Sequence, residues 1–131
     1  MCVFCEIVKG NIPGVKIYED DLVLAILDLS QVTKGHALVM PKEHYDTLLE
    51  CPKETLDRMI ETAQRIAKLQ MTKLHAKGFN ILNNGYEAAG QSVMHAHIHV
   101  IPRYDENDAI EVHFNPSAPQ DLKEVAKLYL E

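Results

Sequence analysis

The sequence predicts an α+β domain in which a mainly antiparallel five-stranded sheet carries one long helix and a short C-terminal helix. Short apolar segments of strand length alternate with turn residues, one long amphipathic segment follows Pro52, and a shorter one begins at Pro119. Strands first joined as hairpins and then crossed by a single long helix are typical of this class. The 131 residues are the length of one domain, and we expect residues 104–131 to form its C-terminal tail and helix.

The first part of the chain predicts a short helical turn and three strands. Residues 2–11 form the helical turn, which a Pro-Gly pair ends. Apolar alternation over 15–18 and a continuous apolar run over 22–27 predict a hairpin around a polar turn. A third strand is expected over 36–40, where Pro41 stops it.

The long helix is the clearest element of the sequence. Pro52 suits the first helical position, where its missing N–H costs nothing, and Gly78 is the expected stop. One apolar face recurs at helical spacing, and its members are Leu56, Met59, Ile60, Ala63, Ile66, Ala67 and Leu74. Two further strands are expected over 79–82 and 93–101, and the last of these ends at Pro102.

Charge and composition exclude several classes of partner. A formal net charge of −6 argues against a surface that grips nucleic acid, because such surfaces are normally basic. No apolar run approaches the roughly 20 residues that span a bilayer, so no membrane partner is expected. The N-terminus lacks the pattern of a secretory signal and the three cysteines are an odd number, so we expect a cytoplasmic protein with free thiols or a metal site.

Three histidines alternate with apolar residues in the segment that ends the sheet. Side chains of a strand alternate between its faces, so His95, His97 and His99 are expected on one face, with the apolar residues packed under the long helix. Such a row has three interpretations: a solvated face, a set of zinc ligands, or a nucleophile with acid–base partners acting on phosphate.

The loop before the histidines favours phosphate chemistry. Gly90, Gln91 and Ser92 follow two alanines, so backbone N–H groups and a hydroxyl can come close to phosphate oxygens. Asn84 stands at the mouth of the same loop and offers an amide donor. These donors next to three aligned imidazoles make a phosphoryl-transfer site the favoured interpretation.

The pattern His95-Ala-His97-Ile-His99-Val-Ile resembles the signature of the histidine-triad (HIT) superfamily of nucleotide hydrolases and transferases. The likeness runs in order from about Cys2 to Arg103. It includes the segments 4–13, 27–30, 35–44, 83–85 and 89–93.

The resemblance implies a role for each matching position. His97 would be the nucleophile that forms a covalent nucleotidyl-histidine intermediate, and His99 would contact the phosphate with His36 nearby. Ser92 would meet the phosphate and the leaving group, and Asp28 the ribose hydroxyls. The remaining expected nucleotide contacts are Phe4, Ile12, Ile26, Leu29, Leu38, Asn84, Gly90, Gln91 and Val93.

The resemblance also implies a structural zinc. Some bacterial members with a Cys-x-x-Cys start bind zinc through these two thiols, a histidine after the Pro-Lys pair and the first histidine of the triad. The corresponding residues here are Cys2, Cys5, His44 and His95. No organic cofactor is expected.

The activity implied is hydrolysis of a nucleoside 5′-phosphate derivative, such as a purine nucleoside phosphoramidate, an adenylate or a dinucleoside polyphosphate. The partner would be a purine nucleotide that leaves an AMP-like product, and the chain would form a homodimer. Two alternatives remain open. One is a nucleotide-binding or interaction module with vestigial activity, and the other is a metal-dependent hydrolase that uses the three histidines as ligands.

Overall fold

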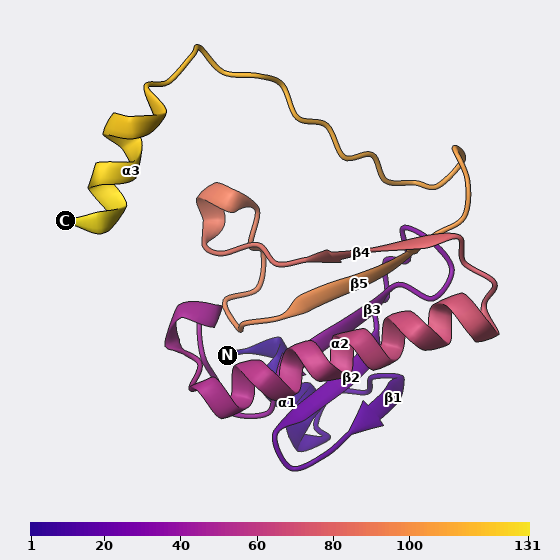
Figure 1. Cartoon of the computed structure of the whole chain (residues 1–131). Helices are drawn as coiled ribbons and strands as arrows, with labels where there is room; N and C mark the ends of the chain where they lie inside the picture. Colours follow the sequence, from indigo (N-terminus) through magenta and orange to yellow (C-terminus); the bar gives the residue numbers. More distant parts are fainter.

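A computed structural model describes all 131 residues and shows one antiparallel sheet of five strands in the order β1-β2-β3-β5-β4 (Figure 1). The predicted α+β class, with its long helix and short C-terminal helix, is confirmed. The elements in chain order are α1 (Val3–Lys9), β1 (Lys16–Glu19), β2 (Val23–Leu27), β3 (Ala37–Pro41), η1 (Leu48–Glu50), α2 (Lys53–Lys73), β4 (Gly78–Leu82), η2 (Glu87–Ala89), β5 (Ile98–Arg103) and α3 (Leu122–Leu130).

Each face of the sheet has its own core, because successive side chains of a strand point to opposite sides. The face under α2 holds mostly small side chains, among them Val23, Ala25, Ala37 and Val100, packed against α2 residues such as Met59. Larger side chains fill the opposite face under α1; they are Leu24, Ile26, Leu38 and Met40 of the strands with Phe4 and Ile7 of α1. His99 belongs to this second face, since it alternates with Ile98 and Val100.

The helix α2 differs from its prediction at both ends and on its face. Pro52 is the N-cap with extended backbone angles, and the helix begins at Lys53. The helix ends at Lys73, and His75 takes the left-handed conformation with φ 61°, so Gly78 is not the stop and begins β4. Ile60, assigned to the apolar face, is half exposed. The apolar periodicity of the sequence predicts a helix but not its end, because the end depends on where the chain turns toward β4.

The last strand is shorter than predicted at its start. β5 begins at Ile98, so the expected strand over 93–101 is wrong for residues 93–97. In that segment the backbone N–H of Ala96 donates to the carbonyl oxygen of Tyr45, a loop residue, at 2.7 Å. The strand continues through Pro102, which pairs with Phe79 of the edge strand β4.

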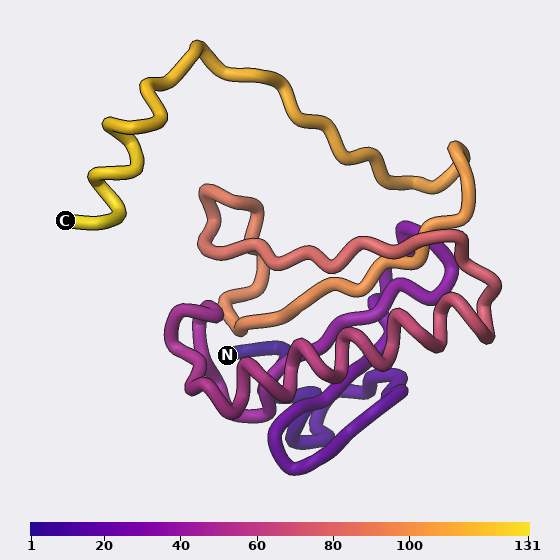
Figure 2. Tube along the Cα trace, in the orientation of Figure 1, coloured from indigo at the N-terminus to yellow at the C-terminus, as the bar shows by residue number.

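Beyond Ile110, whose carbonyl oxygen accepts from Arg103, the C-terminal segment stands clear of the domain (Figure 2). After β5 the chain runs in an extended path to α3, whose N-cap Asp121 accepts hydrogen bonds from the backbone N–H groups of Lys123 and Glu124. None of its residues is buried, and Leu122, Leu128 and Leu130 are exposed. No helix is long and apolar enough to cross a membrane.

Candidate active site

The three histidines of the triad have different partners, although their rings all lie on the α1 side of the sheet. The ring of Phe4 meets those of His95 and His97 edge-on, at centroid distances of 5.8 and 5.1 Å. The ring centroids of His97 and His99 are also 5.1 Å apart. Of the three histidines, only His99 owes its side of the sheet to strand alternation, because His95 and His97 lie before the start of β5.

His97 is held in one tautomer by its own backbone neighbour. Its Nδ1 lies 2.7 Å from the carbonyl oxygen of His95, which can only accept, so Nδ1 carries the proton. The side chain of Asn83 donates to the carbonyl oxygen of His97 at 2.9 Å and fixes the peptide on the other side. The lone pair of this imidazole is therefore on Nε2.

A chain of hydrogen bonds sets the tautomers of the two neighbouring histidines. The backbone N–H of Val32 donates to Nδ1 of His36 at 3.4 Å, so the proton of this imidazole is on Nε2. That Nε2 lies 2.9 Å from Nδ1 of His99, which must accept. The remaining proton of His99 is then on Nε2, where it is a donor. Asp28 lies 3.5 Å from His36 Nε2.

Burial keeps His36 and His99 uncharged at neutral pH. Desolvation is the main cause in both cases, and it lowers the pKa of His36 against the opposing charge of Asp28. The pKa of His99 falls to about 4, because the neighbouring His97 and His36 add to the effect of burial. The pair therefore offers a hydrogen-bond donor without a positive charge.

The loop before the triad is tied down by Gln91, which is buried at 4 % exposure. Its Nε2 donates to the carbonyl oxygens of Asp46 and Val93, and its Oε1 accepts from the backbone N–H of Tyr86. These bonds tie the loop to the backbone at Asp46, Tyr86 and Val93. Ser92, next in the chain, remains exposed.

The residues expected around the nucleotide fall on the face under α1. Phe4, Ile26 and Leu38 belong to the apolar cluster of that face, and Ile12 and Val93 pack against it. Asp28 follows β2 and its side chain is near His36, whereas Leu29 is 92 % exposed. Gly90 adopts φ 96° beside Asn84, whose amide nitrogen is 3.6 Å from the place of a Cβ.

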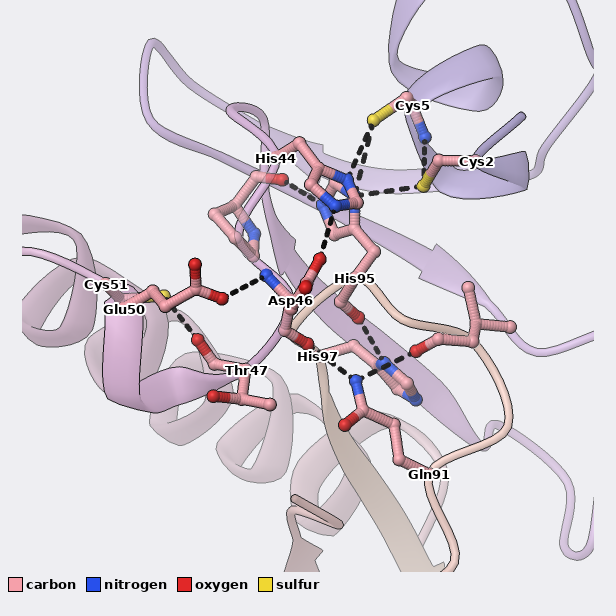
Figure 3. A network of polar contacts seen from close by, with 12 residues as sticks. Cys2, Cys5, His44, Asp46, Thr47, Glu50, Cys51, Gln91, His95 and His97 are labelled. Atoms are coloured by element: carbon pink, nitrogen blue, oxygen red, sulfur yellow. Dashed lines mark hydrogen bonds and ion pairs between the residues drawn. The ribbon is translucent and has the colours of Figure 1, made fainter. Parts of the chain in front are cut away.

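Two thiols and two imidazoles converge beside the triad, and Figure 3 shows the thiols of α1 pointing at the rings of His44 and His95. Cys2 Sγ is 3.3 Å from His95 Nδ1, and Cys5 Sγ is 3.3 Å from His44 Nδ1 and 3.5 Å from His95 Nδ1. A tetrahedral zinc ion with Zn–S of about 2.3 Å and Zn–N of about 2.1 Å separates such atoms by about 3.6 Å. The four ligand atoms thus fit zinc.

The outer partners of these imidazoles suit a metal as well. His44 Nε2 lies 2.8 Å from Asp46 Oδ1, and His95 Nε2 lies 2.8 Å from the carbonyl oxygen of Pro41. Each acceptor takes a hydrogen bond from Nε2–H of its histidine, so the Nδ1 lone pair of that ring points toward the thiols. Most metal-bound histidines have such a partner on the ring nitrogen that does not bind the metal. The sequence did not identify Asp46 or Pro41, although both lie within three residues of His44.

The alternative in which the triad binds one metal does not match this arrangement. His95 belongs to the cysteine cluster, and His99 groups with Asp28 and His36. His97 belongs to neither group of ligands. The three rings therefore do not converge on a common point.

Comparison with known proteins identifies the family. The HIT domain family matches residues 9–106. The chain belongs to the HIT family. Protein hit of Bacillus subtilis is 43 % identical over 129 residues, covering 95 % of this chain and 89 % of the relative. The adenosine 5′-monophosphoramidase hnt1 of Schizosaccharomyces pombe is 37 % identical over 124 residues, covering 93 % and 90 %.

Solved HIT structures have the same fold. A HIT family protein from Bacillus anthracis superposes with a TM-score of 0.91 at 40 % identity, covering 98 % of this chain and 94 % of that one. A zinc-bound histidine triad protein from Mycobacterium smegmatis has a TM-score of 0.78 at 43 % identity, with 97 % and 88 % covered. The HIT family includes nucleotide hydrolases and nucleotide-binding proteins.

The depressed pKa of His99 predicts a pH-dependent stability. Its folded pKa is about 4 against an ordinary 6.5, so the unfolded chain binds more protons in that window. The stability that His99 contributes is complete above pH 6.5 and is lost as the pH falls toward 4. We expect the melting temperature of the wild type to fall more steeply over that range than that of His99→Gln. An equally steep fall in the variant contradicts the assignment, and His113→Gln, at an exposed position, is the control.

Proposed function

We propose that this HIT protein hydrolyses nucleoside 5′-phosphate derivatives through a covalent intermediate on His97. The observation that carries the proposal is the single free nitrogen of His97. Its Nδ1 proton is held by the carbonyl oxygen of His95, which leaves the Nε2 lone pair as the nucleophile. Neutral imidazole attacks phosphorus well, and the fixed tautomer avoids a reorganisation during the reaction.

The proposed reaction has two displacements at the α-phosphorus. His97 Nε2 forms a bond to phosphorus while the bond to the leaving nitrogen, oxygen or sulfur breaks, and the leaving group takes up a proton from solvent. Water then attacks the same phosphorus, gives a proton back to solvent, and the bond to His97 breaks, so that a nucleoside monophosphate is released. The Nε2–H of His99 is the donor for a phosphate oxygen, with its orientation set by His36.

The nucleotide would lie over the face that α1 borders. Asp28 is the acceptor for the ribose hydroxyls, and Phe4, Ile12 and Leu38 supply apolar contact for the base. Ser92 and the backbone around Gly90 would face the phosphate end. We assign Gln91 a positioning role, because its side-chain atoms are already bonded to the loop backbone. The relative hnt1 is an adenosine 5′-monophosphoramidase, which supports a purine nucleotide as the substrate.

The central test is turnover of adenosine 5′-phosphoramidate by the wild type, by His97→Ala and by His75→Ala. We expect His97→Ala to lose roughly a thousand-fold or more in kcat, because no other group can form the intermediate. His75→Ala should keep its activity, since this exposed residue follows α2 outside the site. Acid-quenched wild-type protein should carry a nucleotidyl group that is absent from His97→Ala.

Other outcomes lead to different conclusions. A folded His97→Ala protein with unchanged turnover would overturn the covalent mechanism. If the wild type binds AMP but hydrolyses none of the phosphoramidate, adenylate and dinucleoside polyphosphate substrates, the alternative of a nucleotide-binding module would replace the proposal.

We further propose that Cys2, Cys5, His44 and His95 hold a structural zinc. Zinc bound by two thiolates and two imidazoles would cross-link α1 to the loop after β3 and to the segment before β5. The 3.3 Å separations between thiols and imidazoles support this set. A reducing compartment such as the expected cytoplasm keeps the two thiols from forming a disulfide, so they stay free to bind zinc.

Metal analysis of the purified protein tests the zinc proposal. We expect about one zinc per chain in the wild type and a loss of most of it in Cys5→Ser, together with a lower melting temperature. Cys51→Ser is the matched control, because this third thiol is buried away from the cluster and bonds to the carbonyl oxygen of Thr47. Equal zinc contents in the wild type and Cys5→Ser would contradict the ligand set.

We also propose that the chain forms a homodimer through the edge strand β4 and the adjoining flank of α2. Ile60 and Met71 of α2 and Phe79 and Ile81 of β4 are exposed and line one apolar surface. The strand β4 has no partner on its outer side. An apolar edge strand of this kind is normally covered.

Light scattering after size-exclusion chromatography tests the dimer. We expect the wild type to elute at twice the mass of one chain and Phe79→Asp, at the centre of the surface, to elute as a monomer. Leu49→Asp changes an exposed leucine outside this surface and should leave the mass unchanged. A monomeric wild type would contradict the proposal.

A further inference from the structure

A second cavity lies on the side of the sheet away from the triad. It has a volume of about 540 Å³, a size typical of small-molecule sites, and it lies between α2, the β1–β2 hairpin and the loop before β3. None of its lining residues belongs to the proposed nucleotide site or to the thiol cluster. The proposed hydrolase activity and the proposed zinc site therefore give no reason for this cavity.

The cavity is basic although the chain as a whole is acidic. Lys34, Arg65 and Lys73 line it, and no carboxylate does. Of the 13 lysines and arginines, seven form ion pairs, and these three are half of the remainder. Three unpaired cations around one cavity, in a chain of net charge −6, create a local field that attracts an anion.

The cation of Arg65 is oriented by stacking rather than by an ion pair. Its guanidinium carbon lies 5.0 Å from the ring centroid of Tyr18, which also lines the cavity. The N–H groups of the guanidinium stay unpaired in this arrangement. They are free for a carboxylate, which a planar guanidinium binds through two parallel hydrogen bonds.

The walls of the cavity are suited to an apolar body, and its floor is polar. Ile17, Leu27, Leu69 and Leu74 supply the walls, and Ile17 and Leu69 are nearly half exposed. The floor includes Gln70, which is 2 % exposed and donates through Nε2 to the carbonyl oxygens of Gly35 and Val100. Its Oε1 has no partner, which is unusual for a buried acceptor.

The cavity and the apolar surface proposed for the dimer lie on different flanks of α2. Arg65, Leu69 and Lys73 follow each other at intervals of four residues on one flank. Ile60, Gln64, Lys68 and Met71 line the other. A dimer through β4 would leave the cavity open.

We propose that this cavity is a second ligand site, which binds an organic carboxylate with an apolar chain or ring. The carboxylate pairs with Arg65, Lys73 and Lys34 at the rim, and the apolar body covers the leucine and isoleucine walls. One residue of the cavity, Gln31, bonds to the backbone of the proposed active site. It donates to the carbonyl oxygens of Asp28 and His36 and accepts from the backbone N–H of Gly35. The proposal does not depend on the chemistry of His97.

Titration of the full-length protein with octanoate, followed by amide resonances, tests this site. We expect saturable shifts at Gly35, Gln31 and Leu69. Octanol lacks the charge and inorganic phosphate lacks the apolar body. Each should bind at least about tenfold more weakly than octanoate, because each makes only one of the two kinds of contact.

Two double variants separate the cavity from general electrostatics. Arg65→Gln with Lys73→Gln should weaken octanoate binding by about tenfold, whereas Lys68→Gln with Lys77→Gln removes the same charge elsewhere and should not change it. Three results would overturn the proposal. They are octanoate-induced shifts at the amides of Phe79 and Ile81 instead, an octanoate affinity no higher than that of octanol, and an equal loss of octanoate binding in both double variants. These readouts do not involve catalysis.

Discussion

The hydrogen bond from His97 Nδ1 to the carbonyl oxygen of His95 is the constraint on which the candidate site depends. The same residue, His95, sends its ring to the two thiols and to the carbonyl oxygen of Pro41. The ring and the carbonyl of His95 therefore each have fixed partners, the ring in the thiols and Pro41 and the carbonyl in the Nδ1 proton of His97. The contacts that anchor the N-terminal helix and the contact that orients the nucleophile thus meet in one residue.

The alternation of the sheet separates scaffold from chemistry. Small side chains on one face let α2 approach the strands closely, while the larger ones on the other face form a floor beside His97 and His99. Burial on that floor is what lowers the pKa of His99 and His36. Because both rings are neutral, the N–H of Val32 can orient His36, and His36 can in turn orient His99 through its own hydrogen bond. Two charged imidazoles 2.9 Å apart would repel each other.

The sequence predicted the sheet and the long helix, because these depend on periodicity along the chain. The grouping of Cys2 and Cys5 with His44 and His95 came from the resemblance to the HIT family. The sequence-based prediction failed where tertiary contacts decide. β5 starts at Ile98 because the backbone at Ala96 bonds to Tyr45, far away in sequence. α2 ends before Gly78 because His75 takes the turn. The bonds from the Gln91 side chain to the carbonyl oxygens of Asp46 and Val93 are tertiary contacts as well, which spacing along the chain does not reveal.

The helix α1 has seven residues, which is too short to be stable by itself in water. Its position must therefore come from contacts made elsewhere in the domain. Phe4 and Ile7 bury against the strands, and Cys2 caps the helix through the N–H of Cys5 while its thiol faces His95. Apolar burial alone would leave such a helix free to slide, because that attraction has no direction. The thiol–imidazole contacts are directional, and they fix the ring of Phe4 against the edge of His97.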